Sequence, residues 1–204
     1  GNAIDFSETD LLLAITTISF DISNLELFLP LTRGASVFIA DSATAGDGSL
    51  LKNKLEELRP TWMQATPATW KMLLDSGWKG ASDLSILCGG ETLPSSLAGQ
   101  LLSRCRSLWN VYGPTETTIW ATLYPVQHAE VTIPIGKPLG NMRAYILDKD
   151  RNILPVGAVG NLYLAGVGVG DSYLNLPEQT ASVFLPDPFV SGERMYFTGD
   201  RASY

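Results

Sequence analysis

Short apolar runs alternate with helical patterns along the first 125 residues, and this alternation is the strongest restriction on the fold. A short apolar run rich in β-branched residues is typical of a strand buried on both faces. Strands that alternate with helices form βαβ units, in which the strands lie parallel. The sequence therefore predicts an α/β fold with a mainly parallel sheet flanked by helices. The expected strands are residues 11–20, 35–40, 62–65, 84–88 and 108–111.

Helix signals fill the intervals between these strands. Ser23 and Glu26 have the spacing of a capping box, and Gly34 is a typical stop signal, so a short helix is expected between them. Three further helices are expected at residues 49–59, 67–74 and 94–105.

The pattern changes after Pro125. Short β-type runs are separated by Gly, Pro and Asn turns, which is typical of antiparallel sheets. We expect strands at residues 142–147, 162–165 and 195–197, and one helix at residues 177–184. The predicted organisation is an α/β subdomain over residues 1–128, followed by a small, mostly antiparallel β lobe over residues 129–204.

Composition excludes several classes of protein. The formal net charge is −7 and the pI is about 4.6, which disfavours nucleic-acid binding because phosphate contacts need a basic surface. The longest apolar runs, such as Leu11–Ile15, are far shorter than the roughly 20 residues of a membrane helix. The two cysteines are too few for a disulfide framework. We therefore expect a cytoplasmic protein without membrane or nucleic-acid partners.

Ligands of an open parallel sheet bind beyond the carboxyl ends of its strands. Phe20 and Asp21, Gln64, Gly89 and Tyr112 stand at such strand ends. Asp21 has two interpretations: an acid that interacts favourably with a helix N-terminus, or a counter-ion for a ligand ammonium group.

Residues 110–118 (NVYGPTETT) are the most informative stretch. A strand enters a Gly-Pro pair, after which hydroxyl and acidic residues open a predicted helix. Backbone N–H groups and a Thr hydroxyl suit phosphate oxygens, and Glu116 suits Mg²⁺, which prefers oxygen ligands. Tyr112 suits stacking on a heteroaromatic ring. The alternative is an ordinary capped helix start.

The order Asn-x-Tyr-Gly-Pro-Thr-Glu at residues 110–116 resembles the core motif of adenylate-forming enzymes, and more narrowly the adenylation domains of nonribosomal peptide synthetases. Three further family motifs follow the family's order, at residues 20–23, 160–174 and 196–200. The chain departs from them at Asn161, where the family has Glu, and at Phe197, where it has Arg or Lys. Residues 170–172 (GDS) also stand where Ala-Arg-Gly is usual.

The resemblance implies a flavodoxin-like first subdomain and ATP-dependent activation of an amino acid as an aminoacyl-AMP. It implies ATP and Mg²⁺ as cofactors, and as partner a peptidyl carrier protein whose phosphopantetheine thiol accepts the product. The family's Lys-bearing phosphate loop and C-terminal domain are expected outside residues 1–204, so the isolated chain is expected to be close to inactive.

Roles carry over from the family residue by residue. Asp21 is expected to pair with the substrate ammonium, and Phe20 to border the pocket. Thr115 and Glu116 are expected to be catalytic, contacting the α-phosphate and Mg²⁺. The expected nucleotide contacts are Gly90, Asn110 and Tyr112 at adenine and Asp200 at the ribose.

The pocket positions resemble those of glycine-activating domains: Asp21, Ile22, Leu25, Gln64, Leu87, Gly89, Val111, Ile119 and Trp120. They hold no second charge, and the bulky ones are expected to exclude large side chains, so glycine is the expected substrate and alanine the next. Serine or glutamine remains an alternative substrate, because the Gln64 amide could hydrogen-bond a polar side chain. The remaining alternatives are a non-catalytic substrate-recognition subdomain and an acyl- or aryl-CoA ligase, which Asp21 disfavours because such acids carry no ammonium.

Overall fold

A computed structural model describes residues 4–204. It divides the chain into two compact units: unit 1 runs to Tyr112 and includes Leu123–Gly136, and unit 2 contains Gly113–Thr122 and Lys137–Tyr204. The division differs from the predicted boundary after residue 128 in that 113–122 belong to the second unit and 129–136 to the first. Segment 113–122 is hydrogen-bonded within unit 2, where the Thr118 hydroxyl donates to the Gly168 carbonyl at 2.7 Å.

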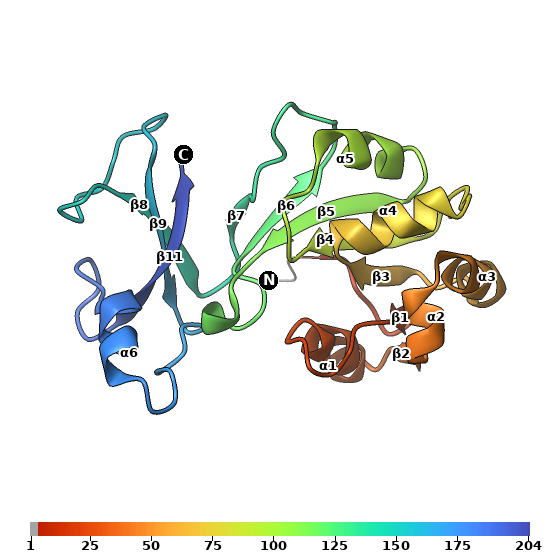
Figure 1. Cartoon of the computed structure of the whole chain (residues 1–204), viewed down its shortest axis with the longest axis horizontal. Coiled ribbons are helices and arrows are strands. Elements are labelled where there is room, and N and C mark those ends of the chain that lie inside the picture. Colours follow the sequence, from red (N-terminus) through yellow and green to blue (C-terminus); the bar gives the residue numbers. More distant parts are fainter. Residues whose placement is uncertain (1–3) are drawn as a thin grey trace. The chain divides into compact units, whose positions relative to one another are not determined.

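The large sheet has the strand order β2-β1-β3-β4-β5-β6-β7 (Figure 1). Strand β1 pairs with β2 and β3, β3 with β4, and β4 with β5, and all four pairings are parallel. The predicted fold class is therefore confirmed. The strands are β1 (Leu11–Ala14), β2 (Ser36–Ile39), β3 (Trp62–Ala65), β4 (Ser85–Gly89), β5 (Ser107–Tyr112), β6 (Thr122–Val126) and β7 (Lys137–Pro138).

The helices of unit 1 are α1 (Ser23–Arg33), α2 (Ser42–Gly46), α3 (Gly48–Leu58), α4 (Pro67–Asp75) and α5 (Ser95–Leu102). Four of them confirm the predicted helices to within a few residues. The short helix α2 was not predicted; the Asp41 side chain caps it by accepting from the Thr44 N–H at 2.7 Å.

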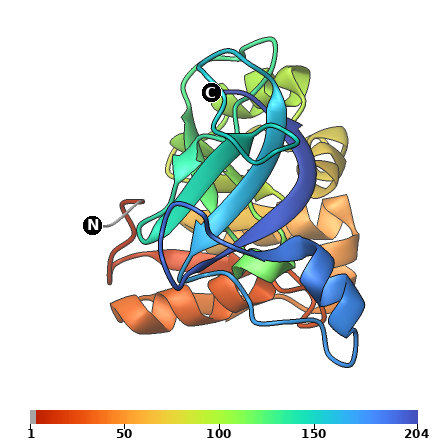
Figure 2. The ribbon, with the colours of Figure 1, turned by 90° about the vertical axis from the view of Figure 1, so that its left-hand side faces the viewer.

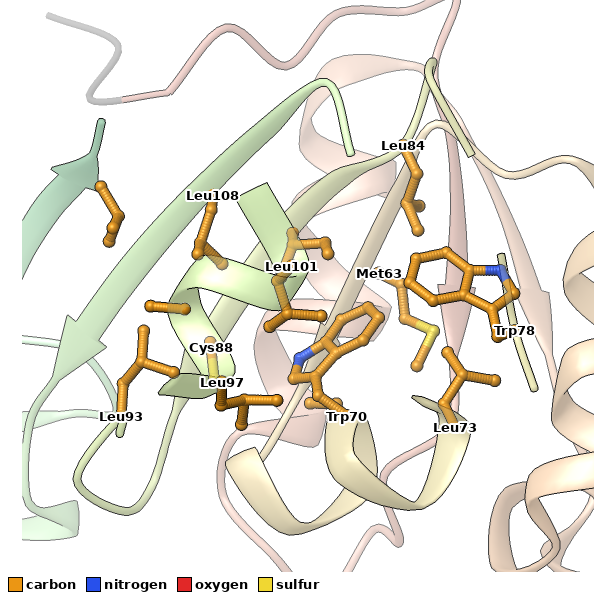
Figure 3. Close-up of a cluster of buried hydrophobic side chains, with 14 of the residues drawn as sticks. Met63, Trp70, Leu73, Trp78, Leu84, Cys88, Leu93, Leu97, Leu101 and Leu108 are labelled. Carbon is orange, nitrogen blue, oxygen red and sulfur yellow. The ribbon is translucent and has the colours of Figure 1, made fainter. Parts of the chain in front are cut away.

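One face of this sheet carries the main hydrophobic core (Figure 3). Alternate strand residues such as Met63 and Cys88 point into it, where they meet Trp70 and Leu73 of α4 and Leu101 of α5. All five are fully buried. Because side chains alternate along a strand, the neighbours of these residues point to the opposite face of the sheet.

Two local predictions were wrong, and one side chain explains both. The apolar run at 11–20 is a strand only over Leu11–Ala14, and Ser23 and Glu26 do not form a capping box because α1 has no side-chain cap. The Glu26 carboxylate instead accepts the backbone N–H groups of Ile15 and Thr16, at 2.9 and 3.0 Å. Those two N–H groups are thereby withdrawn from the sheet, and the strand ends.

Unit 2 contains a four-stranded antiparallel sheet in the order β10-β11-β9-β8 (Figure 2). A cluster of buried side chains, Leu147, Tyr163, Ala165 and Met195, packs on one face of this sheet. The strands are β8 (Met142–Leu147), β9 (Gly160–Gly166), β10 (Phe184–Pro186) and β11 (Arg194–Ala202), and helix α6 (Pro177–Val183) packs against β10 and β11. These elements confirm the predicted β lobe and its helix.

Within residues 4–204, no helix combines the length and the apolar composition that crossing a membrane requires.

Candidate functional site

Four of the predicted pocket residues lie on one face of the sheet in unit 1. Gln64 is in register with Leu87, and Gly89 with Val111. Because Leu87 and Gly89 are two residues apart on one strand, all four side-chain positions face the same way, opposite the core of Figure 3. The four residues are buried. The parallel sheet thus brings together positions far apart in the sequence, as the strand-end rule predicts.

Phe20 and Gly90 also meet at this end of the sheet. A Cβ atom on Gly90 would lie 3.7 Å from Cζ of Phe20 and 3.4 Å from Cγ2 of Thr66. Gly90 has a φ of +85°, a backbone conformation that favours glycine. The segments after β1, β3 and β4 therefore converge, and Gly90 lies against the ring expected to border the pocket.

Asp21 and Ile22 lie in the turn that leads into α1, and Leu25 lies in the first turn of the helix itself. Asp21 is half-buried and Ile22 is buried. The Asp21 carbonyl accepts from the N–H of Asn24 at 3.0 Å and from its side-chain amide at 2.9 Å. Because Ile22 occupies the N-cap position, Asp21 stands one residue before it, at the edge of the helix.

A buried polar network connects this helix to the sheet. The Gln64 amide nitrogen donates to the Ile22 carbonyl at 2.8 Å and to Glu26 Oε1 at 3.0 Å. The Thr16 hydroxyl donates to the same Glu26 oxygen at 2.6 Å. Burial raises the pKa of the Glu26 carboxyl above its ordinary value, and these hydrogen bonds act in the opposite direction.

Asn110 and Tyr112, the predicted adenine contacts, are at the end of β5. Asn110 is buried, and its side-chain amide donates to the Pro134 carbonyl at 2.8 Å. Tyr112 is half-buried. The Asn110 amide therefore holds the loop after β6 in place within unit 1.

Residues 113–122 of unit 2 form a tight loop around a single 3₁₀ turn, Thr115–Thr117. The prediction of a full helix here was wrong, because Thr118 and Ile119 adopt positive φ angles of 62° and 72° and end the turn. A Cβ atom on Gly113 would lie 2.3 Å from the Ile119 carbonyl oxygen. The loop thus closes on itself at Gly113, beside Ile119 and the buried Trp120.

Thr115 and Glu116 are the residues of this loop whose side-chain oxygens are expected to contact the α-phosphate and Mg²⁺. Thr115 is exposed and Glu116 half-buried. Glu116 Oε1 accepts a hydrogen bond from the Tyr173 hydroxyl, and the Glu116 carbonyl accepts from the Gly170 N–H at 2.8 Å. Among residues 4–204 no cluster of three or more His, Cys, Asp or Glu side chains has metal-binding geometry. One carboxylate nonetheless fits Mg²⁺, which is commonly held by one or two carboxylates together with substrate phosphates and water.

Asp200 lies on β11 and is exposed. The β9–β11 pairing is irregular between Phe197 and Arg201, and Gly199 has a φ of +81°. The Thr198 hydroxyl accepts from the Asp200 N–H at 3.0 Å and donates to the Leu162 carbonyl at 2.9 Å. The Thr-Gly-Asp sequence is therefore an irregularity within a strand, and it displays Asp200 at the surface.

Comparison with known proteins assigns the family. The family model described as AMP-binding enzyme matches residues 1–174. The chain belongs to the AMP-binding enzyme family. The resemblance to nonribosomal peptide synthetase adenylation domains, predicted from four motifs, is also confirmed by the relatives and structures that match nearly the whole chain.

Among sequences, a dimodular nonribosomal peptide synthase of Bacillus subtilis (strain 168) is 43% identical over 204 residues, covering 99% of this chain and 9% of that protein. Among structures, holo-AB3403, a four-domain nonribosomal peptide synthetase bound to AMP and glycine, has a TM-score of 0.90 and 43% identity, and the match covers 96% of this chain and 15% of that one. The synthetase FmoA3 has a TM-score of 0.88 and 29% identity, and the match covers 97% of this chain and 22% of that one. This member of the AMP-binding enzyme family thus spans a small part of its relatives.

Sequence reasoning missed two residues that contact the predicted site. Glu26 was assigned to a capping box, although a buried glutamate among apolar helix residues is itself a signal of hydrogen bonding. Tyr173 was noted only as part of a motif, and nothing in the sequence indicates its contact with Glu116.

Proposed function

We propose that this chain is the substrate- and nucleotide-binding part of an adenylation domain that activates glycine, with alanine as the next-best substrate, and transfers it to a peptidyl carrier protein. One observation carries the proposal: Gln64, Leu87, Gly89 and Val111 share a sheet face, and Gln64 is hydrogen-bonded to the residue after Asp21. A single carboxylate beside a small apolar surface suits an amino acid that has an ammonium group and almost no side chain.

In the proposed reaction, a carboxylate oxygen of glycine attacks the α-phosphorus of ATP, and pyrophosphate leaves. Asp21 holds the substrate ammonium through a charge-assisted hydrogen bond. Thr115 donates to an α-phosphate oxygen, and Glu116 is the protein ligand of Mg²⁺. When bound, Mg²⁺ stabilises the negative charge on the phosphates. The phosphopantetheine thiol of the carrier then displaces AMP.

The other nucleotide contacts are proposals of the same kind. Tyr112 stacks on adenine, beside Asn110 and Gly90, and Asp200 accepts from the ribose hydroxyls. Asp200 suits this role because its carboxylate is displayed at the surface by an irregular strand.

Steric exclusion accounts for the choice of glycine. Leu25, Leu87, Ile119 and Trp120 are bulky side chains at pocket positions. Overlap with such side chains rejects large substrates strongly, whereas one methyl group is worth about 1–3 kcal/mol, so alanine is rejected only moderately. The AMP and glycine bound to the 43% identical synthetase support this choice.

Amino-acid-dependent pyrophosphate exchange tests the proposal. Because the chain spans 9% of the dimodular synthase, we would place residues 1–204 in that synthase in exchange for the matching segment. Glycine is expected to give the highest rate in a panel with alanine, serine, leucine and phenylalanine. Trp120→Ala is expected to shift the preference toward larger substrates. A wild-type segment that prefers leucine or phenylalanine would contradict the assignment.

A further inference from the structure

The Glu26 carboxylate and the Gln64 amide form a buried network that takes no part in the proposed reaction. Both side chains are fully buried, and they connect α1 to β3 and to the chain after β1. We propose that this pair fixes the position of Asp21, so that the ammonium contact holds the substrate against the bulky pocket side chains that distinguish glycine from alanine. The inference rests on the proposed role of Asp21 and extends it to two positioning residues.

The donor capacity of the Gln64 amide is fully used within the protein. Its nitrogen lies 2.8 Å from the Ile22 carbonyl oxygen and 3.0 Å from Glu26 Oε1. A primary amide has two N–H donors, and both neighbours are acceptors. No N–H group therefore remains for a polar substrate side chain, and the influence of Gln64 on the substrate passes through α1.

Glu26 anchors the other end of the same segment. Its Oε2 accepts from the N–H groups of Ile15 and Thr16, and its Oε1 accepts from the Thr16 hydroxyl and from Gln64. Four donors around one buried carboxylate form charge-assisted hydrogen bonds, which are stronger than neutral ones. The carboxylate thus joins the end of β1 to the first turn of α1.

Asp21 lies on the short segment between these two anchors. Thr16 is held at one end by Glu26, and Ile22 at the other end by Gln64. Between them, the Phe20 N–H donates to the Thr17 carbonyl at 3.0 Å, which shapes the turn. A displacement of about 1 Å at a positioning group costs up to about a hundredfold in rate. Release of either anchor is therefore expected to act on the ammonium contact of Asp21.

Gln64→Met is the most direct test, because methionine has a similar length and no N–H donor. In the segment-exchanged synthase we expect the KM for glycine to rise about tenfold, the glycine-to-alanine ratio of kcat/KM to fall, and kcat to change by less than about threefold. Met63→Ala is the matched control. It removes a buried side chain on the opposite face of the same strand and is expected to leave the ratio unchanged.

Glu26→Gln gives a second, independent test of the pairing. The new amide must direct its NH₂ group either at the NH₂ group of Gln64 or at the N–H groups of Ile15 and Thr16. In either orientation two hydrogen-bond donors face each other, which is unfavourable. Replacing Gln64 as well removes that conflict. We therefore expect Glu26→Gln with Gln64→Met to raise the KM by less than the product of the single effects.

Amide hydrogen exchange of the 204-residue chain gives a readout that does not depend on activity. Protection at Ile15 and Thr16 is expected to fall in Glu26→Gln and Gln64→Met, and to fall less in Met63→Ala. If the wild type activates glycine but Gln64→Met changes neither the KM nor the ratio, the inference is overturned and the proposed function stands. If the wild type prefers another amino acid, the proposed substrate fails. In that case the exchange data still test the network, and unchanged protection of Ile15 and Thr16 in Glu26→Gln and Gln64→Met would contradict it.

Discussion

The two units hold their candidate site residues by different means. In unit 1, Gln64, Leu87, Gly89 and Val111 take their places from regular parallel pairing, which fixes both the register and the sheet face. In unit 2, the site residues lie on a 3₁₀ turn that ends at Thr118 with a positive φ, and on an irregular strand. The difference teaches that regular strand pairing positions these sheet residues of unit 1, whereas unusual backbone geometry positions the site residues of unit 2.

The largest expected effect comes from the backbone of unit 2. Gly113→Ala places a Cβ atom 2.3 Å from the Ile119 carbonyl oxygen and 2.7 Å from the Ala121 nitrogen, so backbone must move. We expect a loss of about 3 kcal/mol in the free energy of unfolding, measured by urea unfolding. Gly140→Ala is the control in the same unit, since nothing lies within 4 Å of its Cβ position. Equal losses for the two variants would contradict the importance of the loop geometry.

The next effect concerns the buried carboxylate of unit 2, which is held differently from that of unit 1. Asp187 of unit 2 has a fully buried side chain and pairs with Arg143 at 3.2 Å, whereas Glu26 of unit 1 is held by amide, N–H and hydroxyl donors. Asp187→Asn is expected to cost about 2 kcal/mol of unfolding free energy, because a charged hydrogen-bond partner is lost. Glu193→Gln also removes a partner of Arg143, but its carboxylate is half-exposed, so less than about 1 kcal/mol is expected. A larger loss of unfolding free energy in Glu193→Gln than in Asp187→Asn would refute this ranking.

The smallest effect is the pH dependence of Glu26. Burial raises its folded-state pKa above the ordinary value of 4.5, so the folded state binds the proton more strongly than the unfolded state. Its contribution to stability is therefore complete below about pH 4.5 and is lost as the pH rises through the folded-state pKa. The stability of the wild type relative to Glu26→Gln should fall as the pH rises through this window.

Asp41 supplies a control of opposite sign. The Thr44 backbone N–H lowers the pKa of the Asp41 carboxyl, so its contribution is present above the ordinary value of 3.8 and is lost as the pH falls through the lowered pKa. The stability of the wild type relative to Asp41→Asn should therefore rise with pH. Two difference curves of the same sign would contradict one of these assignments.

Regular elements were predictable from the sequence because their determinants are local. The buried run at Trp62–Ala65 and the Pro67 helix start were found directly. The end of β1 at Ala14 was not, because a carboxylate eleven residues beyond Ile15 takes the backbone N–H groups that the strand would use. In the site, strand ends indicated Asp21 and Gln64, but the contact between Glu116 and Tyr173 joins residues 57 positions apart and leaves no local pattern.

The central proposal is that Asp21 of unit 1 binds the amino-acid substrate and that Asp200 of unit 2 binds the nucleotide. The most direct test compares Asp21→Asn and Asp200→Asn in the segment-exchanged synthase, with the KM for glycine and the KM for ATP measured for each. We expect Asp21→Asn to raise the glycine KM by about 10- to 100-fold, the equivalent of one charged hydrogen bond, with little change for ATP. Asp200→Asn should show the opposite pattern. A rise in the same KM for both variants, or an unchanged glycine KM in Asp21→Asn, would contradict the account.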